Sequence, residues 1–169
     1  MVGQMLQLVA TAMGGDAEAR QALGMTLTAW RMAGGGLAVP VMLTELAEAC
    51  LLADDAEAAR LALEEAAVVM EETDQRSAEP EILRLGALVQ SRSGASVETV
   101  VKELVGAARL ALEQGSVRLA ARALVNIRDT TGGALPAPAA AVAAEFLAEL
   151  PASAGDDLRE VAGWVSAQA

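Results

Sequence analysis

Apolar residues recur at helical spacing along most of this chain. The clearest stripe lies in the segment 38–94, where four apolar residues fall at positions i, i+3, i+4 and i+7: Leu43, Leu46, Ala47 and Cys50. This period predicts an amphipathic α-helix with one buried face. Similar stripes before and after this segment predict an all-α chain.

Turn residues separate the stripes and mark the expected helix ends. Glycines after a stripe predict helix C-termini, and Pro40 and Pro80 suit a first helical turn. Asp16, Asp55 and Ser96 are expected to cap the helices that follow them. Nine helices are predicted, at about residues 2–13, 17–33, 38–53, 56–72, 78–92, 97–114, 116–129, 139–150 and 156–168.

The helix starts repeat with a period near 40 residues. The longer second helices start near residues 17, 56 and 97, and the first helices of the later pairs start near 38, 78 and 116. Stacked helical hairpins with this period predict an α-solenoid, and a non-repeating helical bundle is the rival fold. We expect a repeat array over residues 1–132 and capping helices over 133–169. Pro136 and Pro138 are expected to keep the linker before those helices extended.

Composition agrees with an all-α protein and narrows its partners. Hydrophobic residues make up 54% of the chain, but aromatic residues only 2%, and alanine, the best helix former, dominates. The formal net charge is −11. Between residues 45 and 81 there are 12 acidic and two basic residues. Nucleic acid and anionic membrane are therefore not expected as partners.

The residue types present disfavour catalysis and metal binding. Histidine is absent, which removes the commonest general base and metal ligand. Cys50 is the only cysteine, so neither an intrachain disulfide nor a thiol metal cluster is possible, and we expect it to be buried. Adjacent pairs such as Glu64-Glu65 point about 100° apart on a helix and do not converge. No catalytic residue, metal site or cofactor is predicted.

The apolar N-terminus lacks a basic signal-peptide region and is too short to span a bilayer, so a cytoplasmic protein is expected. The first quarter of the chain is also rich in methionine. Met5 and Met13 are candidates for an apolar surface that packs against another subunit or a preceding domain. Core filling is the alternative role for these side chains.

Three stretches carry a resemblance to a known family. They are PxxLxxLAEA over residues 40–49, EETxxRxxExEIxRL over 71–85 and, more weakly, AARLALEQGSVRLAARAL over 107–124. These motifs resemble the tetratricopeptide-like C-terminal region of bacterial signalling ATPases, which include maltose-activator-type transcriptional regulators and some class III adenylate cyclases. Ser77-Ala78 replace the aromatics usual there, and the nucleotide-binding and DNA-binding or cyclase domains have no counterpart. The resemblance implies a sensor and docking arm.

The preferred hypothesis is therefore a non-catalytic module that binds a protein partner or forms a homodimer. Thr44, Glu48 and Arg84 are predicted to be exposed on the first helices and to contact the partner. Arg118 and Arg122 lie one turn apart and are candidates for an acidic peptide or a phosphate group, or for local ion pairs. The alternative is a small-molecule sensor that holds an apolar ligand between hairpins. An enzyme that uses carboxylates alone ranks last.

Overall fold

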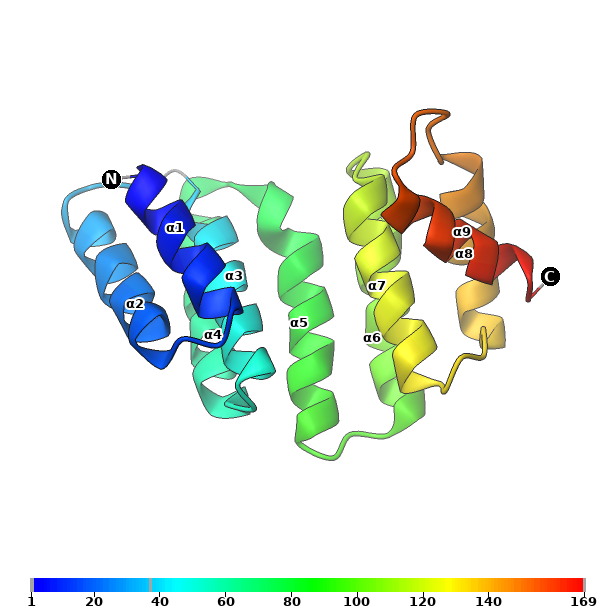
Figure 1. Ribbon diagram of the computed structural model, residues 1–169, viewed down its shortest axis with the longest axis horizontal. Helices are drawn as coiled ribbons and strands as arrows, with labels where there is room; N and C mark the ends of the chain where they lie inside the picture. Colours follow the sequence, from blue (N-terminus) through cyan, green and yellow to red (C-terminus); the bar gives the residue numbers. More distant parts are fainter. Residues whose placement is uncertain (1, 37, 169) are drawn as a thin grey trace. The chain divides into compact units, whose positions relative to one another are not determined.

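The computed structural model describes residues 2–36 and 38–168, and this part of the chain is helical without a strand (Figure 1). The prediction of an all-α chain is confirmed. No helix among these residues is both long and apolar enough to cross a membrane. The elements are α1 (Val2–Met13), α2 (Ala17–Met32), α3 (Val39–Leu52), α4 (Ala56–Thr73), the 3₁₀ turn η1 (Arg76–Ala78), α5 (Glu79–Arg92), α6 (Val97–Glu113), α7 (Val117–Thr130), α8 (Ala137–Ala148) and α9 (Asp156–Ser166).

Side-chain caps start three of these helices at the predicted residues. The Asp16 carboxylate accepts a hydrogen bond from the Ala19 amide at 3.0 Å, and the Asp55 carboxylate caps α4 in the same way at 3.0 Å. The Ser96 hydroxyl accepts from the Thr99 amide at 3.2 Å. Each bond satisfies one of the amides that a helix N-terminus leaves without an intrahelical partner.

The start of α8 corrects one expectation. Pro138 was expected to belong to an extended linker, but it lies in the first turn of α8, which begins at Ala137. A proline is tolerated there because the amide that it lacks would have no intrahelical acceptor. Pro136 is extended and is the N-cap residue.

Contacts divide the chain into two compact units, Met1–Ser93 and Gly94–Ala169. We call them unit 1 and unit 2. Helices α8 and α9 thus belong to the same unit as α6 and α7. The expected boundary between a repeat array and capping helices, at residues 132 and 133, stays a prediction.

Unit 1 is built from overlapping helix triplets. Helix α1 packs against α2 and α3, and α2 packs against α3; the same contacts recur among α3, α4 and α5. One apolar cluster fills the first triplet and reaches α4: Met5, Leu23, Leu27, Val39, Met42, Leu43, Ala66 and Val69. A second fills the next triplet: Ala47, Cys50, Leu51, Ala59, Ala62, Leu63, Leu85 and Val89.

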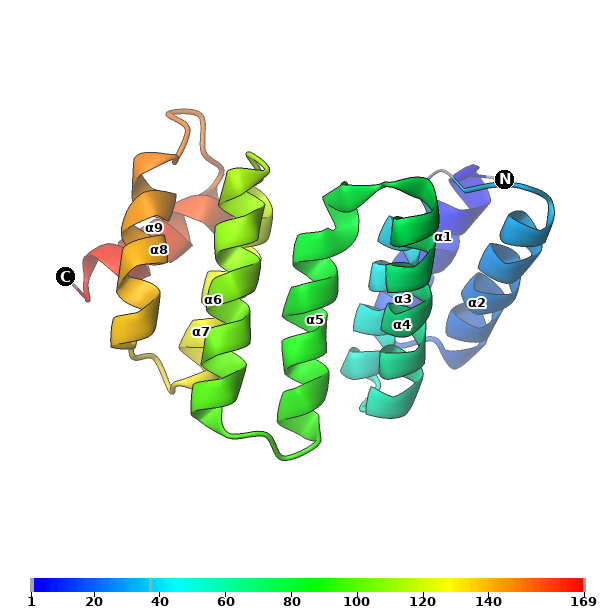
Figure 2. The same cartoon turned by 180° about the vertical axis from the view of Figure 1, so that it is seen from behind.

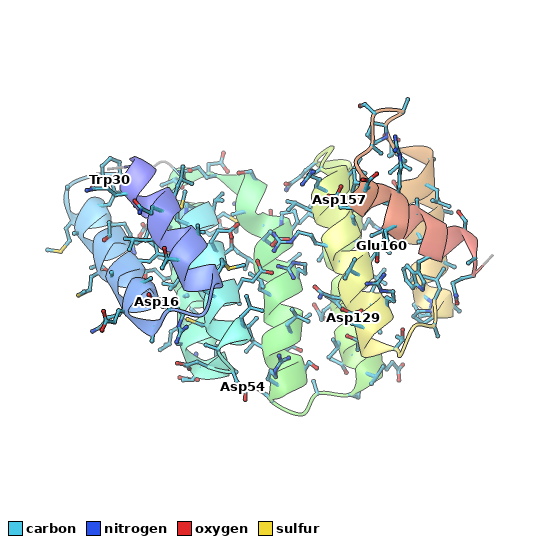
Figure 3. The ribbon with its side chains drawn as sticks, in the orientation of Figure 1. Asp16, Trp30, Asp54, Asp129, Asp157 and Glu160 are labelled. Atoms are coloured by element: carbon cyan, nitrogen blue, oxygen red, sulfur yellow. The ribbon has the colours of Figure 1, made fainter. Side chains whose placement is uncertain are left out.

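Unit 2 packs α6 against α7 and α8, and α9 against α7 and α8. The largest buried side chain of its helices belongs to Phe146, the only phenylalanine of the chain. The Trp164 indole Nε1–H donates to the carbonyl oxygen of Gly133 at 2.9 Å and holds the α7–α8 turn against α9. Arg128 on α7 also reaches Glu160 on α9 at 3.2 Å; Figure 3 labels Glu160.

Candidate functional site

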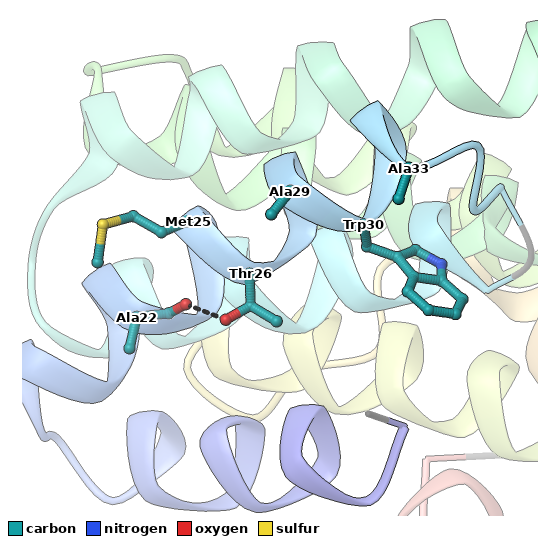
Figure 4. Close-up of a pocket in the computed structure, with 6 residues that line it drawn as sticks. All are labelled: Ala22, Met25, Thr26, Ala29, Trp30 and Ala33. Atoms are coloured by element: carbon teal, nitrogen blue, oxygen red, sulfur yellow. Dashed lines mark hydrogen bonds between the residues drawn. The ribbon is translucent and has the colours of Figure 1, made fainter.

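An apolar groove with a volume of about 350 Å³ runs along α2 (Figure 4). We call it the α2 groove. Met25 is 61% exposed at its edge, so the groove is open to solvent. Six residues of α2 and its C-cap line it: Ala22, Met25, Thr26, Ala29, Trp30 and Ala33.

The α2 groove follows from two apolar stripes on one helix. The stripe formed by Ala19, Leu23 and Leu27 is buried in unit 1. Ala22 and Ala29, seven residues apart, belong to a second stripe that turns away from that core. Helical residues seven apart lie on the same side after two turns, so the second stripe is continuous along the helix.

The side-chain hydroxyl of Thr26, inside the α2 groove, already has a hydrogen-bond partner. The Thr26 hydroxyl donates to the Ala22 carbonyl oxygen at 2.7 Å, the bond drawn in Figure 4. A threonine hydroxyl bonded back to its own helix has already used its one donor hydrogen. The groove therefore offers chiefly apolar contact area.

Trp30 forms one end of the groove and is fixed by a close packing contact. A Cβ atom added at Gly35 would overlap the Trp30 indole, so the ring lies directly on that glycine. Its Nε1 atom is buried and has no hydrogen-bond partner among the residues that the structure describes. A buried donor without a partner costs about 1–3 kcal/mol. The apolar packing of the ring has to offset this cost.

Met5 and Met13, the predicted partner-binding methionines, have core contacts. Met5 is only 4% exposed and lies in the first apolar cluster of unit 1. Met13 is half-buried and packs against a small cluster of Ala12, Ala19 and Ala49. An external partner does not reach Met5 without opening this packing. The methionine that is open on the α2 groove is Met25 instead.

The predicted exposure of Thr44 and Arg84 is wrong. Both residues are 3% exposed, and Thr44 donates its hydroxyl to the Val41 carbonyl oxygen at 2.7 Å. The Arg84 guanidinium donates twice to Glu81, both at 2.9 Å, and once to Glu48 at 3.0 Å. The side chains of Glu81 and Glu48 are only 9% and 18% exposed. Arg84 is buried because these carboxylates compensate its charge inside the protein.

We call Arg84, Glu81 and Glu48 the ion cluster. It ties α5 to α3 and is a stabilising feature of the interior, not an open binding surface. Sequence reasoning missed Glu81 as a partner of Arg84. The signal was present, because residues three apart on a helix are neighbours, but their burial depends on packing with other helices.

The two predicted anion-binding arginines lie on α7 in unit 2. Arg118 is 74% exposed at its side chain and pairs with Asp157 of α9 at 3.3 Å; Figure 3 labels Asp157. Arg122 is half-buried and already engaged within the chain. Arg118 therefore forms a local ion pair, which is the alternative role considered for it. The binding of an acidic peptide or a phosphate group by Arg118 and Arg122 stays a prediction.

Cys50 is buried, as expected, at the bottom of a hollow of about 310 Å³ between α2, α3 and α4. Burial raises the pKa of its thiol, and the nearby Asp55 carboxylate adds to the rise. A raised pKa lowers the fraction of reactive thiolate.

Over residues 2–36 and 38–168, no group of three or more Cys, Asp or Glu side chains is placed to hold a metal ion.

Comparison with known proteins does not identify a family. The chain matches no protein-family model, and no curated protein and no solved structure is significantly similar to it.

Proposed function

We propose that this chain is a non-catalytic, tetratricopeptide-like α-solenoid module that binds a protein partner through the α2 groove. The partner is another protein or, in a homodimer, a second copy of the chain. The observation that supports this function is the uncovered apolar stripe of α2, with Met25 61% exposed at its edge. The docking role implied by the family resemblance agrees with it.

The recurrence of helix contacts in unit 1 supports the solenoid part of the proposal. The contacts among α1, α2 and α3 are repeated among α3, α4 and α5. In a solenoid each repeat contacts its neighbours in the same way, as these two triplets do.

The shape of the α2 groove favours a protein over a small molecule. Its volume of about 350 Å³ lies at the lower end of small-molecule sites, which enclose most of the ligand surface. A groove open along one helix does not enclose a ligand in this way. It suits the apolar side of a partner helix, which contributes contacts at every turn.

The proposal is tested with Ala29→Arg, a substitution in the middle of the groove. Ala29 is exposed and arginine is a good helix former, so we expect the variant to fold, as judged by circular dichroism. We expect wild-type protein immobilised on beads to retain a partner from a lysate of the source organism, or to sediment as a dimer. Ala29→Arg should lose that association.

Val97→Arg serves as the matched control, because Val97 is 55% exposed on α6 and lies outside the α2 groove. It should retain the same partner or the same dimer as wild type. The proposal fails if wild-type protein neither retains a protein nor dimerises. It also fails if Ala29→Arg associates as well as Val97→Arg does.

A further inference from the structure

A second surface of unit 1 lies between α2 and α4, which both face the viewer in Figure 2. Its floor is a hollow of about 290 Å³ lined by Thr28, Arg31, Met32 and Glu65. Met32, at the α2 edge, is 85% exposed. We call this surface the α2–α4 valley. It is separate from the α2 groove, because the two share no lining residue.

The α4 side of the valley carries large aliphatic side chains in solvent. Leu61 and Val68 are each 53% exposed. They are seven residues apart, so they lie on one side of α4 and about 10.5 Å apart along its axis. A partner helix repeats its own apolar residues at the same spacing and can contact both. The 18 residues of α4 give the edge a length of about 27 Å, enough for several turns of a partner helix.

Carboxylates surround these aliphatic residues. Helix α4 contributes five glutamates and one arginine: Glu57, Glu64, Glu65, Glu71, Glu72 and Arg60. Arg60 pairs with Glu57 and Glu64, and Arg76 pairs with Glu71. Arg31 of α2 crosses the floor to Glu65 at 2.8 Å and to Glu72 at 3.2 Å.

Three arginines thus pair with five glutamates, and the surface keeps a net negative charge. A carboxylate accepts several hydrogen bonds, so a paired glutamate still has acceptor sites for another cation. The acidic excess extends over the whole unit, since residues 1–93 contain 14 acidic and six basic residues.

This charge selects among the possible occupants of the valley. A second copy of the chain that docks through this same face would bring charge of the same sign, and nucleic acid and anionic lipid are negative as well. Lysine and arginine side chains at the edges of a bound helix would instead lie opposite the glutamates. Complementary charge of this kind raises the association rate and suppresses wrong partners.

We propose that the α2–α4 valley binds a cationic amphipathic helix of a partner protein. The apolar side of that helix contacts Met32, Leu61 and Val68, and its basic residues contact the glutamates of α4. The inference does not depend on the α2 groove, so one surface can fail its test while the other passes.

The test uses a synthetic 18-residue helix with leucine at heptad spacing and lysine at the other positions. Its binding to the full chain is measured by fluorescence anisotropy at 50 and 500 mM salt. A scrambled peptide of the same composition is the control for nonspecific attraction. We expect saturable binding of the amphipathic peptide, at least tenfold tighter than that of the scrambled peptide, and weaker binding at the higher salt concentration.

Substitution by glutamate separates docking from simple attraction between opposite charges. Met32→Glu and Val68→Glu make the valley more acidic but remove apolar contacts, so docking predicts at least tenfold weaker binding. Nonspecific attraction predicts tighter binding. Val97→Glu, outside the valley, is the matched control and should bind like wild type.

Equal binding of the two peptides, or tighter binding by Met32→Glu and Val68→Glu, would overturn the inference. Binding of an anionic peptide with the same leucine pattern, at the affinity of the cationic one, would also overturn it. Because each substituted side chain is more than half exposed, we expect these variants to fold, and circular dichroism checks this directly.

Discussion

Replacing Arg84 by methionine removes the cation at the centre of the ion cluster and keeps a side chain of similar length. The guanidinium donates hydrogen bonds of 2.9–3.0 Å to Glu81 and Glu48. Arg84 is 3% exposed, so water does not replace these bonds in the folded protein. The variant therefore leaves buried negative charge without its arginine.

The expected loss of stability is about 3 kcal/mol. Removing one partner of a buried ion pair costs about 3–5 kcal/mol, and the lower end applies because the Glu48 side chain is 18% exposed and regains some hydration. For a chain of this size, 1 kcal/mol shifts Tm by about 2–4 °C. We expect Arg84→Met to lower Tm by about 6–12 °C.

The measurement is urea and thermal unfolding followed by circular dichroism at 222 nm. Arg60→Met is the matched control, because Arg60 also makes two hydrogen bonds to a glutamate three residues earlier, Glu57, and one to Glu64. The Arg60 side chain is 42% exposed, so its ion pairs are hydrated and screened. Its Tm should stay close to that of wild type.

The comparison isolates burial, because the two arginines share their local geometry. A loss of less than about 1 kcal/mol in Arg84→Met would mean that the unpaired carboxylates do not carry the desolvation cost expected of buried charge. Equal losses in Arg84→Met and Arg60→Met would contradict the reasoning as well. Adding Glu81→Gln to Arg84→Met should recover part of the stability, because the amide removes a buried charge.

Three further predictions concern local features. Gly106→Ala should raise the free energy of unfolding by about 0.5–1 kcal/mol in urea titrations, because a Cβ in this exposed position of α6 meets no other atom within 4 Å. Ser96→Ala should lower it by about 1 kcal/mol, since it removes the α6 cap; Ser116→Ala, which removes no side-chain cap bond, should change it much less. Burial raises the pKa of the Cys50 thiol, so its contribution to stability is intact below the unfolded pKa, about 8.5, and is lost as pH rises through the folded pKa. In urea titrations, Cys50→Ala should therefore flatten the loss of stability above about pH 8.5.

The sequence predicts the helices well, because their signals are local. Asp16, Asp55 and Ser96 each precede a stripe of apolar residues, and each accepts a hydrogen bond from an amide three residues later. Such caps depend on only a few neighbouring residues. Pro138 shows the limit, because a proline is compatible both with an extended linker and with a first helical turn.

The candidate surfaces were harder to predict, because they depend on contacts between distant residues. Arg84 was expected to be exposed, as most arginines are, but Glu48, 36 residues earlier, compensates its charge in the interior. The α2 groove was missed although Ala22 and Ala29 are spaced for one helical side. Alanine spacing alone does not tell which of two apolar stripes the core covers.

The two tryptophans of the chain are divided between its units, Trp30 on α2 and Trp164 on α9. The chain contains no tyrosine, so its intrinsic fluorescence comes from these two indoles. Trp164 donates its N–H to Gly133, whereas Trp30 lies on Gly35 with its N–H buried, so each ring reports a different local environment. With Trp30→Phe only unit 2 emits, and with Trp164→Phe only unit 1 does. A pair of melting curves from these variants shows directly whether the two halves unfold in one cooperative step or in succession.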